Sequence, residues 1–361
     1  MSPFTFFKNI IPLQYSSSFI FFIFGWISFY FSGVFSYSLI LFAFVFLPLV
    51  EVFLPKNTKF FFLDLDSEKD SFIYDLILYL TIPLQYISLF LFLFVINNYD
   101  LSNYDLIGKV LAMGTLCGHS INIAHELGHR SNKFEQFLAK LLLLSSLYMH
   151  FFIEHNKGHH RRVGTFDDPA TARKGEWLYA FFFRSIVFQY LSAWQIELKR
   201  LKIKKISFFS FKNEMIQFTF FQLFITISIF YLNFFSGFLF IISAFFGILL
   251  LETINYVEHY GLVRKLKDNG RFEALSEFHS WNSDFILGRL LLHQLTLHSD
   301  HHLKASKKYQ YLKNLPNAPR HPSGYPGMMV LAFFPPLWFF CMNHLVEKYR
   351  AKSKIKKTQT L

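Results

Sequence analysis

The chain has 361 residues, of which 53% are hydrophobic and only 17% are charged. Soluble domains carry about 25% charged residues, so this composition excludes an ordinary soluble protein and favours a membrane protein. The net charge of +12 would suit a nucleic-acid-binding protein. However, the basic tail at 348–361 lacks the interleaved aromatic side chains that stack on bases. We therefore expect this tail to lie near anionic lipid, and we expect no nucleic acid partner.

Runs of about 20 apolar residues cross a bilayer as helices. The first apolar run lacks the short apolar stretch and the small-residue cleavage site of a signal peptide, so it is expected to be a true span. The predicted fold class is an all-α integral membrane protein with six transmembrane helices and a cytoplasmic, histidine-rich helical cap. The six predicted spans are 14–32, 35–54, 75–97, 104–124, 216–235 and 238–257.

The distribution of basic residues predicts the orientation of these spans, because Lys and Arg gather on the cytoplasmic side of membranes. Of the 36 Lys and Arg residues, 14 lie in 131–215 and 16 lie in 261–361. Both of these segments and both termini are therefore expected in the cytoplasm. The predicted divisions are four spans ending in a histidine motif, a first cap segment, two further spans and a second cap segment with the basic tail. Their ranges are 1–130, 131–215, 216–260 and 261–361.

Nine of the 15 histidines fall into four clusters. Spacings of three and four residues place side chains on one face of a helix. Neutral imidazole is the commonest metal-binding side chain, and one first-row ion rarely takes more than six ligands, so nine imidazoles predict two metal ions. The spacing does not identify the metal, because imidazole suits Fe, Cu, Zn and Ni alike. The nine are His125, His129, His155, His159, His160, His259, His298, His301 and His302.

The remaining histidines and the neighbouring carboxylates are assigned more modest roles. Four carboxylates beside the clusters are expected to orient imidazole N–H groups, or else to serve as helix-end charges. With two cysteines and no Cys-x-x-Cys, thiolate metal sites and disulfide frameworks are not expected, and Cys117 is interpreted as a small packing residue. The four carboxylates are Glu126, Glu154, Glu258 and Asp300. The histidines expected to be structural are His119, His150, His293, His321 and His344.

Parts of the sequence are also compatible with two other functions. The stretch HELGH at 125–129 matches the H-E-x-x-H signature of zinc proteases. That signature binds one zinc with one further ligand, whereas seven further clustered histidines are present here. A membrane transporter or metal-binding scaffold would need charged residues in the middle of its spans, and the predicted spans are almost free of charge. Both alternatives are therefore less favoured than an enzyme with two metal ions.

The histidine clusters resemble the three histidine boxes of integral-membrane di-iron enzymes, including desaturases, hydroxylases and monooxygenases. HELGHR, EHNKGHHRR, NYVEHYGL and LHSDHH are similar to the four signature motifs of membrane-bound alkane 1-monooxygenases, and desaturases generally lack NYVEHYGL. The resemblance extends over about 119–345. This sequence departs from it at Thr296-Leu297, where Gln-Arg is usual, at Arg130, where Lys is common, and at Asp284. These changes concern the electron donor and substrate more than the metal ligands.

The resemblance implies two iron ions held by the nine histidines, in a di-iron centre that activates O2. One oxygen atom would enter the terminal C–H bond of a medium or long alkane, giving a 1-alkanol. Electrons would come from rubredoxin, reduced by an NADH-dependent reductase, at a bacterial inner (cytoplasmic) membrane. The motifs add Asp168, Asn255 and Asn282 to the candidate residues around the ligands. Related substrates stay open as the alternative, namely those of a xylene-type methyl hydroxylase or a fatty-acyl desaturase or hydroxylase.

Two finer predictions concern the electron donor and the substrate. Without a Cys-x-x-Cys, the rubredoxin is expected to be a separate protein. The basic stretches 198–205 and 159–162 would attract an acidic donor, although ordinary membrane-surface charge explains them equally well. Ala43 is small among bulky neighbours in LFAFVFLPL, so it would leave room for a longer chain if this face of the second span lines a substrate channel. Packing against a neighbouring helix is the favoured alternative for Ala43.

Overall fold

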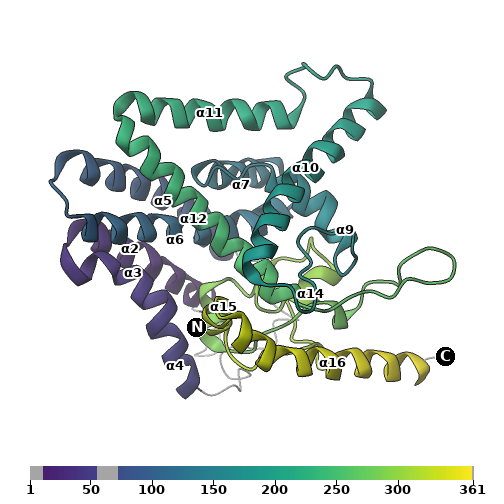
Figure 1. Cartoon of the computed structure of the whole chain (residues 1–361). Helices are drawn as coiled ribbons and strands as arrows, with labels where there is room; N and C mark the ends of the chain where they lie inside the picture. The colour runs from purple at the N-terminus through teal and green to yellow at the C-terminus, as the bar shows by residue number, and fades with distance from the viewer. Residues whose placement is uncertain (1–10, 55–71, 360–361) are drawn as a thin grey trace, which may run out of the picture.

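The computed structural model describes residues 11–54 and 72–359, and the regular elements of this part of the chain are all helical. Six helices or helix pairs in it are long and apolar enough to cross a membrane, which confirms the six predicted spans. Figure 1 shows most of these helices lying side by side, with the shorter helices gathered at one end. The spans are Ile11–Tyr30, Gly33–Phe53, Phe72–Asn98 (α5), Asn103–Gly128 (α6), Glu214–Leu232 (α11) and Phe234–His259 (α12).

The first two spans are each built from several helical pieces. The first joins a 3-10 helix, Ile11–Phe19 (η1), to Ile20–Tyr30 (α2). The second contains a π-helical turn at Phe42–Phe46 (η3), between the short helix Ser38–Leu41 (α3) and Leu47–Phe53 (α4). π-helical turns often occur at functional sites, because the extra residue redirects side chains.

Helix α6 is the centre of the bundle. In it, 83% of the residues of the apolar window are buried, against 17% in α11, which lies at the periphery. α6 packs closely on α12, and a Cβ added at Gly247 of α12 would lie only 2.5 Å from the Cβ of Cys117. Cys117 is buried and forms no disulfide, as expected for a small packing residue. This close packing fixes the two helices whose ends carry His125, His129 and His259.

Two charged residues near the start of α6 hold the turn between the first two spans. The Lys109 Nζ donates to the carbonyl oxygens of Ser28 and Phe29 at 3.0 Å and of Phe31 at 2.7 Å. These carbonyls lie at the end of α2, where a helix has no backbone partners of its own. The Asp105 carboxylate accepts from the Gly33 amide, which has a φ of +67°. These two charged side chains therefore bond to backbone groups at the turn between the spans, and they do not form an ion pathway.

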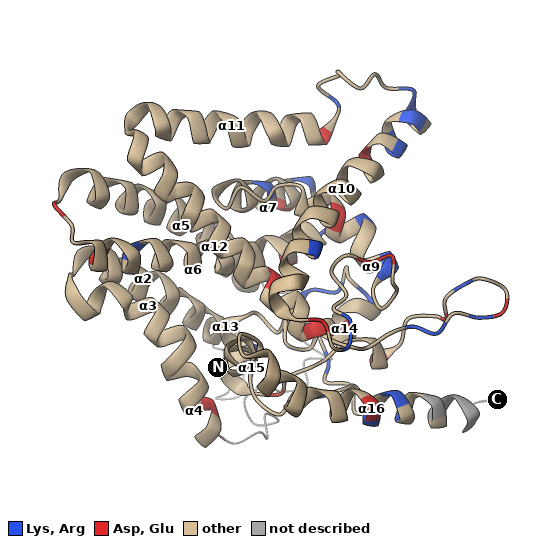
Figure 2. Ribbon diagram, viewed as in Figure 1, with Lys and Arg blue, Asp and Glu red and all other residues tan. Residues whose placement is uncertain are grey.

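The segment after the fourth span begins with helices that bring the second histidine motif into place. They are Lys133–Ser145 (α7), Phe151–Glu154 (α8), the π-helical turn His155–His159 (η5), His160–Arg162 (α9) and the long helix Leu178–Lys204 (α10). Figure 2 shows that the Lys and Arg positions along the ribbon gather around α9, the end of α10 and the later part of the chain, whereas the opposite end of the spans is almost free of them.

The segment after α12 contains five short helices in long connections and ends in the long helix Pro335–Gln359 (α16). The short helices are Glu277–His279 (η6), Ile286–Leu291 (α13), His298–Leu303 (α14), Tyr309–Tyr311 (η7) and Tyr325–Ala332 (α15). α15 packs against α12, η3 and α4. The turn from α15 into α16 leaves Phe334, Leu337 and Phe340 exposed. An apolar helical hairpin therefore lies beside the second and sixth spans, within a segment that the sequence patterns placed wholly in the cap.

Candidate metal centre

All nine clustered histidines converge on one region where the ends of two spans meet the second and last histidine motifs. α6 carries His125 near its end, with His129 directly after it, and α12 ends at His259. The other six lie on η5 and α9 and on α14. The side chains separate into two groups, and within each group one atom of every side chain lies within 4.8 Å of the others. The groups are His125, His129, His155, His160 and His301, and His159, His259, His298 and His302.

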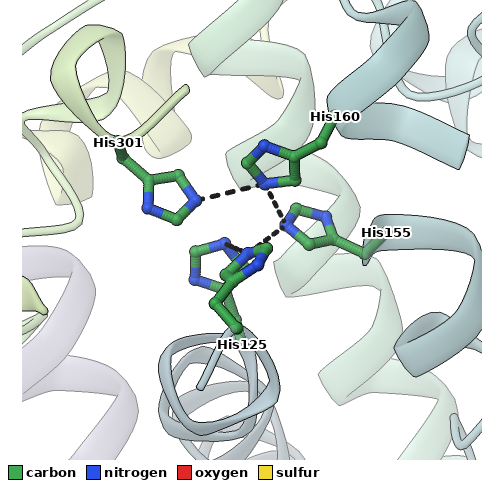
Figure 3. A group of neighbouring side chains, drawn as sticks. His125, His155, His160 and His301 are labelled. Atoms are coloured by element: carbon green, nitrogen blue, oxygen red, sulfur yellow. Dashed lines mark hydrogen bonds between the residues drawn. The ribbon is translucent and has the colours of Figure 1, made fainter. Parts of the chain in front are cut away.

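The first group, called here the five-histidine group, is drawn in Figure 3, where the labelled rings come from different elements and face a common centre. The Nε2 atoms of His129 and His125 lie 3.2 Å apart, and those of His155 and His129 lie 3.1 Å apart. The Nε2 of His160 lies 3.0 Å from that of His155 and 3.2 Å from that of His301. His129 and His160 are half-buried, and the other three are buried.

The second group, called here the four-histidine group, is buried throughout. The Nε2 of His298 lies 3.1 Å from the Nε2 of His259 and 2.9 Å from the Nε2 of His302. The His159 Nε2 is buried and has no hydrogen-bond partner among the described residues. Four ring nitrogens thus surround one point, which matches the number of ligands in a tetrahedral zinc site and is sufficient for other first-row metals.

A neutral imidazole has one N–H donor and one acceptor nitrogen, and the donor lies on only one side of the ring. In both groups the Nε2 atoms lie at hydrogen-bond distance from one another, and each is a donor or an acceptor according to the tautomer of its ring. With the proton of each ring on Nδ1, the Nε2 lone pairs of a group would face one another, and a cation at the centre of the group would be coordinated by them. The donor set of neutral nitrogens fits iron, copper, zinc or nickel, and two sites fit a di-iron centre.

The π-helical turn η5 separates adjacent histidines between the two groups. His155 and His160 belong to the five-histidine group, while His159 belongs to the four-histidine group. A Cβ added at Gly158 in this turn would lie 2.5 Å from the Glu154 Oε1 and 2.6 Å from the Arg162 Nη2, so a larger residue there would have to displace the ion pair of these two side chains. α14 is divided in the same way, since His301 joins one group and His298 and His302 join the other.

Burial keeps the rings outside the spans neutral. Desolvation holds the pKa of His155, His160, His298 and His302 well below the ordinary value, and it lowers the pKa of His301 to about 3. The neighbouring histidines add to this effect, because each would repel a second positive charge. Neutral rings keep a lone pair free for a metal at physiological pH.

Asp168 has the opposite effect on His159. The Asp168 Oδ2 lies 2.9 Å from the His159 Nδ1 and also accepts from the Thr171 hydroxyl at 2.6 Å. Burial alone would lower the pKa of His159 and raise that of Asp168, but the ion pair outweighs burial, so His159 is raised and Asp168 is lowered. A carboxylate on Nδ1 fixes the ring and leaves Nε2 free for a metal, which is the usual arrangement of carboxylate, histidine and metal.

Glu258 is, after Asp168, the second predicted carboxylate that contacts a histidine of the four-histidine group. Its Oε2 lies 3.2 Å from the Nε2 of His298, on the side that faces the other three rings. Its Oε1 is buried without a hydrogen-bond partner among the described residues. Glu258 therefore contacts the His298 ring, and its role toward that ring stays a prediction.

The remaining predicted residues around the ligands make other contacts. The Glu126 Oε1 accepts from Arg130 at 2.6 Å and from the Tyr309 amide at 3.1 Å, and the Glu154 Oε1 accepts from Arg162 at 2.7 Å. Burial raises the pKa of Glu154 to about 7. The other three contacts also lie within the scaffold. Asp300 accepts from Lys307, Asn282 caps α14 by accepting from the Ser299 amide at 2.8 Å, and Asn255 donates to Glu252 at 3.3 Å.

Two adjoining cavities lead from the spans to the five-histidine group. The larger has an empty volume of about 530 Å³ and is almost entirely apolar. Its wall includes Ala43, Phe44 and Leu47 from η3 and α4, so Ala43 faces a cavity. The smaller, of about 220 Å³, is lined by His125 and His301. Asn122 and Leu292 line both cavities, so the two cavities adjoin at these residues.

Sequence reasoning did not identify Glu252 as a residue of interest. Its buried carboxylate on α12 accepts from Tyr148 at 3.0 Å, from Gln189 at 2.9 Å and from Ser185. The network ties α12 to α10 and to the chain just before α8. Its partners are polar residues in otherwise apolar or amphipathic stretches, and no short motif joins them, so only the fold shows the network.

The histidines assigned structural roles differ from one another. His321 places its Nε2 3.1 Å from the Val257 carbonyl oxygen and stacks on Trp281, which is a structural contact. His150 packs edge-on against Tyr148, and His344 is exposed. His119 lines the larger cavity and His293 lines the smaller one. The last two therefore lie beside the metal centre, although neither joins a histidine group.

Comparison with known proteins agrees with this geometry. Residues 106–329 match the fatty acid desaturase family. An alkane 1-monooxygenase of Alcanivorax borkumensis is 39% identical over 277 residues, covering 75% of this chain and 67% of the relative. An alkane 1-monooxygenase of Pseudomonas putida is equally similar, with 39% identity and the same coverage. The hydroxylase component of xylene/toluene monooxygenase from Pseudomonas putida is 30% identical over 87% of this chain and 83% of its own length. The chain thus belongs to the alkane 1-monooxygenase family of oxidoreductases, within the membrane desaturase and hydroxylase superfamily.

Proposed function

We propose that this membrane monooxygenase inserts one oxygen atom from O2 into the terminal C–H bond of medium or long alkanes, giving 1-alkanols. The observation that carries the proposal is the apolar cavity beside the spans, which adjoins the smaller cavity lined by His125 and His301. An alkane has no polar group for the protein to hold, so position must come from the shape of an apolar cavity.

The nine histidines would hold two iron ions, which supply the oxygen chemistry that no side chain can perform. Asp168 holds His159 in one orientation through Nδ1, and Glu258 is placed to contact an ion in the four-histidine group. The larger cavity keeps water away from the reacting carbon, because its exposed lining is almost wholly apolar. A linear chain that enters it presents one end to His125 and His301, which favours reaction at a terminal carbon.

Ala43 provides the test of the substrate cavity. Its side chain is 4% exposed and lines the larger cavity with Phe44 and Leu47. Ala43→Trp should fill part of the cavity and shorten the longest alkane that is hydroxylated, which product analysis on a series of chain lengths would measure. Ala112, which is fully buried on α6 and does not line the cavity, is a control position at which Ala→Ser should leave the range unchanged. If Ala43→Trp hydroxylates the same range of alkane lengths as the wild type, Ala43 does not line the substrate channel.

A separate rubredoxin, reduced by an NADH-dependent reductase, would supply the electrons. Arg161, on α9 next to His160, is exposed, as are Lys202 and Lys204 near the end of α10. Arg162 is less suitable for a test, because it also bonds to Glu154 and Ser192 inside the protein. Arg161→Glu should slow rubredoxin-dependent turnover and weaken its salt dependence, because steering acts on the association rate. Equal turnover of Arg161→Glu and the wild type at low salt would exclude α9 as the docking site.

The basic end of the molecule also supports an orientation. Because Lys and Arg favour the cytoplasmic side, the histidine groups and both termini would face the cytoplasm of a bacterial inner membrane. In this orientation, the two spans within 216–260 would lie between two cytoplasmic cap segments, 131–215 and 261–361. Labelling of single cysteines introduced at Ser353 and at Asn98 from either side of the membrane would test this orientation.

The xylene/toluene relative favours a second substrate class, the methyl group of a methylarene. A fatty-acyl desaturase or hydroxylase activity is the weaker alternative, because NYVEHYGL at 255–262 is not generally found in desaturases. Purified protein with rubredoxin, its reductase and O2 would be offered alkanes, methylarenes and fatty-acyl chains together. 1-Alkanols and two irons per chain would support the proposal, benzyl alcohols or alkenes would redirect the substrate, and a single zinc would contradict the di-iron centre.

A further inference from the structure

His119 and His293 form a buried imidazole pair at the junction of the two cavities. Their ring centroids lie 6.5 Å apart. His119 lines the larger, apolar cavity, and His293 lines the smaller cavity beside His125 and His301. Two residues, Asn122 and Leu292, line both cavities, and the Asn122 Nδ2 donates to the Leu292 backbone carbonyl oxygen at 3.3 Å. The histidine pair thus borders both the apolar cavity and the cavity beside the metal centre.

The pair has four ring nitrogens without partners. In the described part of the chain, His119 and His293 are the two histidines in which both nitrogens are buried and lack a hydrogen bond. The two rings are only 5% and 3% exposed. A buried donor or acceptor without a partner costs about 1–3 kcal/mol. His321 shows the ordinary solution, since one of its buried nitrogens faces a backbone carbonyl oxygen.

The surroundings hold both rings in place by their faces and not by their nitrogens. His119 stacks on Phe21 with centroids 4.7 Å apart, and Phe22 meets it edge-on at 5.8 Å. His293 stacks on Tyr15 at 6.1 Å and meets Tyr309 edge-on at 5.2 Å. Aromatic packing of this kind would be satisfied equally by phenylalanine, so packing alone does not explain the imidazole nitrogens.

The backbone at His293 is also strained. His293 has a φ of +49° and Gln294 a φ of +58°, in the left-handed region that non-glycine residues rarely adopt. Each such residue costs about 1–3 kcal/mol and is found mainly at functional sites. The Gln294 side chain accepts from the Arg289 Nε at 2.7 Å and donates to the Tyr15 hydroxyl at 2.6 Å, which holds this corner in place. The corner places His293 against the smaller cavity and opposite His119.

We propose that His119 and His293 form a hydrogen-bonding subsite for an oxygen atom carried by the substrate chain, so that the enzyme accepts hydrocarbon chains bearing one ether or hydroxyl oxygen as well as plain alkanes. The subsite rests on the proposed function, because it assigns a substrate class to the same cavity. An imidazole N–H donates to either kind of oxygen, and a hydroxyl can also donate to the free lone pair of the second ring. Ionisable residues inside membrane spans commonly mark such functional sites.

The subsite fixes a position along the chain. His119 precedes His125 by six residues on α6, which is an axial separation of about 9 Å in an α-helix. The oxygen must therefore lie several carbons from the reacting end, at one preferred place. Oxygen at other places would meet the apolar wall and lose its hydrogen bonds to water without replacement.

The test is a binding experiment on the purified full chain in detergent, without electron donor. The probes are linear chains of one length in which a single ether oxygen replaces successive methylene groups, with the plain alkane as reference, and ligand-induced thermal stabilisation gives the dissociation constants. We expect tightest binding at one oxygen position and a roughly fivefold to tenfold loss there in His119→Phe/His293→Phe. The alkane itself should bind this variant as well as, or better than, the wild type. His119→Asn should retain part of the preference.

The controls separate the subsite from simpler roles. His321→Phe, at a buried histidine away from both cavities, should not change the oxygen preference. Equal weakening by oxygen at every position, in both the wild type and the double variant, would show that the pair holds only water and would overturn the proposal. Because binding is measured without turnover, plain alkane that binds without being hydroxylated would count against the proposed function and leave the subsite standing.

Discussion

The two histidine groups differ in access and in charge. The five-histidine group includes the half-buried His129 and His160, and two of its rings line the smaller cavity. The four-histidine group is fully buried and adds the carboxylates of Asp168 and Glu258. The five-histidine group has one neutral ligand more than the other group and borders the cavity proposed for the substrate. The four-histidine group has fewer histidines and has two carboxylates nearby. We infer that the four-histidine group retains its ion and that the five-histidine group faces the reacting chain.

The largest expected difference comes from removing one ligand from each group. His302→Ala leaves three histidines around its ion and should lower activity more than about 100-fold, with loss of about one iron per chain. His129→Ala leaves four, which still complete a tetrahedral set, so it should retain both irons and lose less activity. Iron analysis and product rates of the two variants would measure this. Equal iron loss in both would show that the groups are equivalent.

Removal of the Asp168 carboxylate should weaken the four-histidine group selectively. Asp168→Asn keeps the size of the side chain but loses the charge that orients His159, and outer-shell partners of this kind contribute 10–100-fold to metal affinity. Metal titration of the purified apo chain would show one weakened site of the two. Asp300→Asn is the matched control, because Asp300 bonds to Lys307 and not to a histidine.

A chelator should distinguish the groups by rate. The half-buried rings of His129 and His160 give the five-histidine group a more open side than the four buried rings of the other group. We expect one iron to leave several times faster than the other. The decrease in metal absorbance over time after addition of the chelator would measure the two rates. Release of both irons in a single phase would contradict the difference in access.

The smallest expected effect concerns stability in acid. It would show that a buried histidine outside the two histidine groups also lowers the stability of the folded protein at low pH. Burial lowers the pKa of His321 to about 3, whereas the unfolded value is about 6.5. The unfolded chain therefore binds a proton that the folded chain excludes, and this contribution to stability is lost as pH falls below about 6.5. The loss is about 2 kcal/mol by pH 5. His321→Gln should have a flatter dependence of melting temperature on pH between 7 and 5 than wild type.

Local sequence patterns were sufficient to predict the six spans and to find the four histidine clusters. Apolar length alone predicted six spans, because lipid requires long uninterrupted helices. The spacing of His125 and His129, or of His298 and His302, places each pair on one helix face. The sequence could not show that His159 and His160 serve different groups, since this depends on a π-helical turn. That turn leaves no pattern in the sequence.

Contacts between segments that are far apart in the sequence could not be predicted from local patterns. Glu126, Glu154 and Asp300 stand beside histidines in the sequence, yet each accepts a bond from Arg or Lys in the fold. Adjacency along a helix turns neighbouring side chains about 100° apart, so a residue next to a ligand usually points elsewhere. His119 and His293 are separated by more than 170 residues, and only the packing of α6 against the corner before α14 brings them together.

The division of η5 and α14 between the two groups has a consequence for metal uptake. Because His159 and His160 are consecutive, an ion that orders one of these rings also orders the backbone that presents the other. The same holds for His301 and His302. Filling one group should then preorganise the other, so the group that keeps its ion longer also prepares the more open group to take its ion again. In a cell short of iron, a molecule that holds one ion would therefore regain the second more readily than an empty molecule would gain its first.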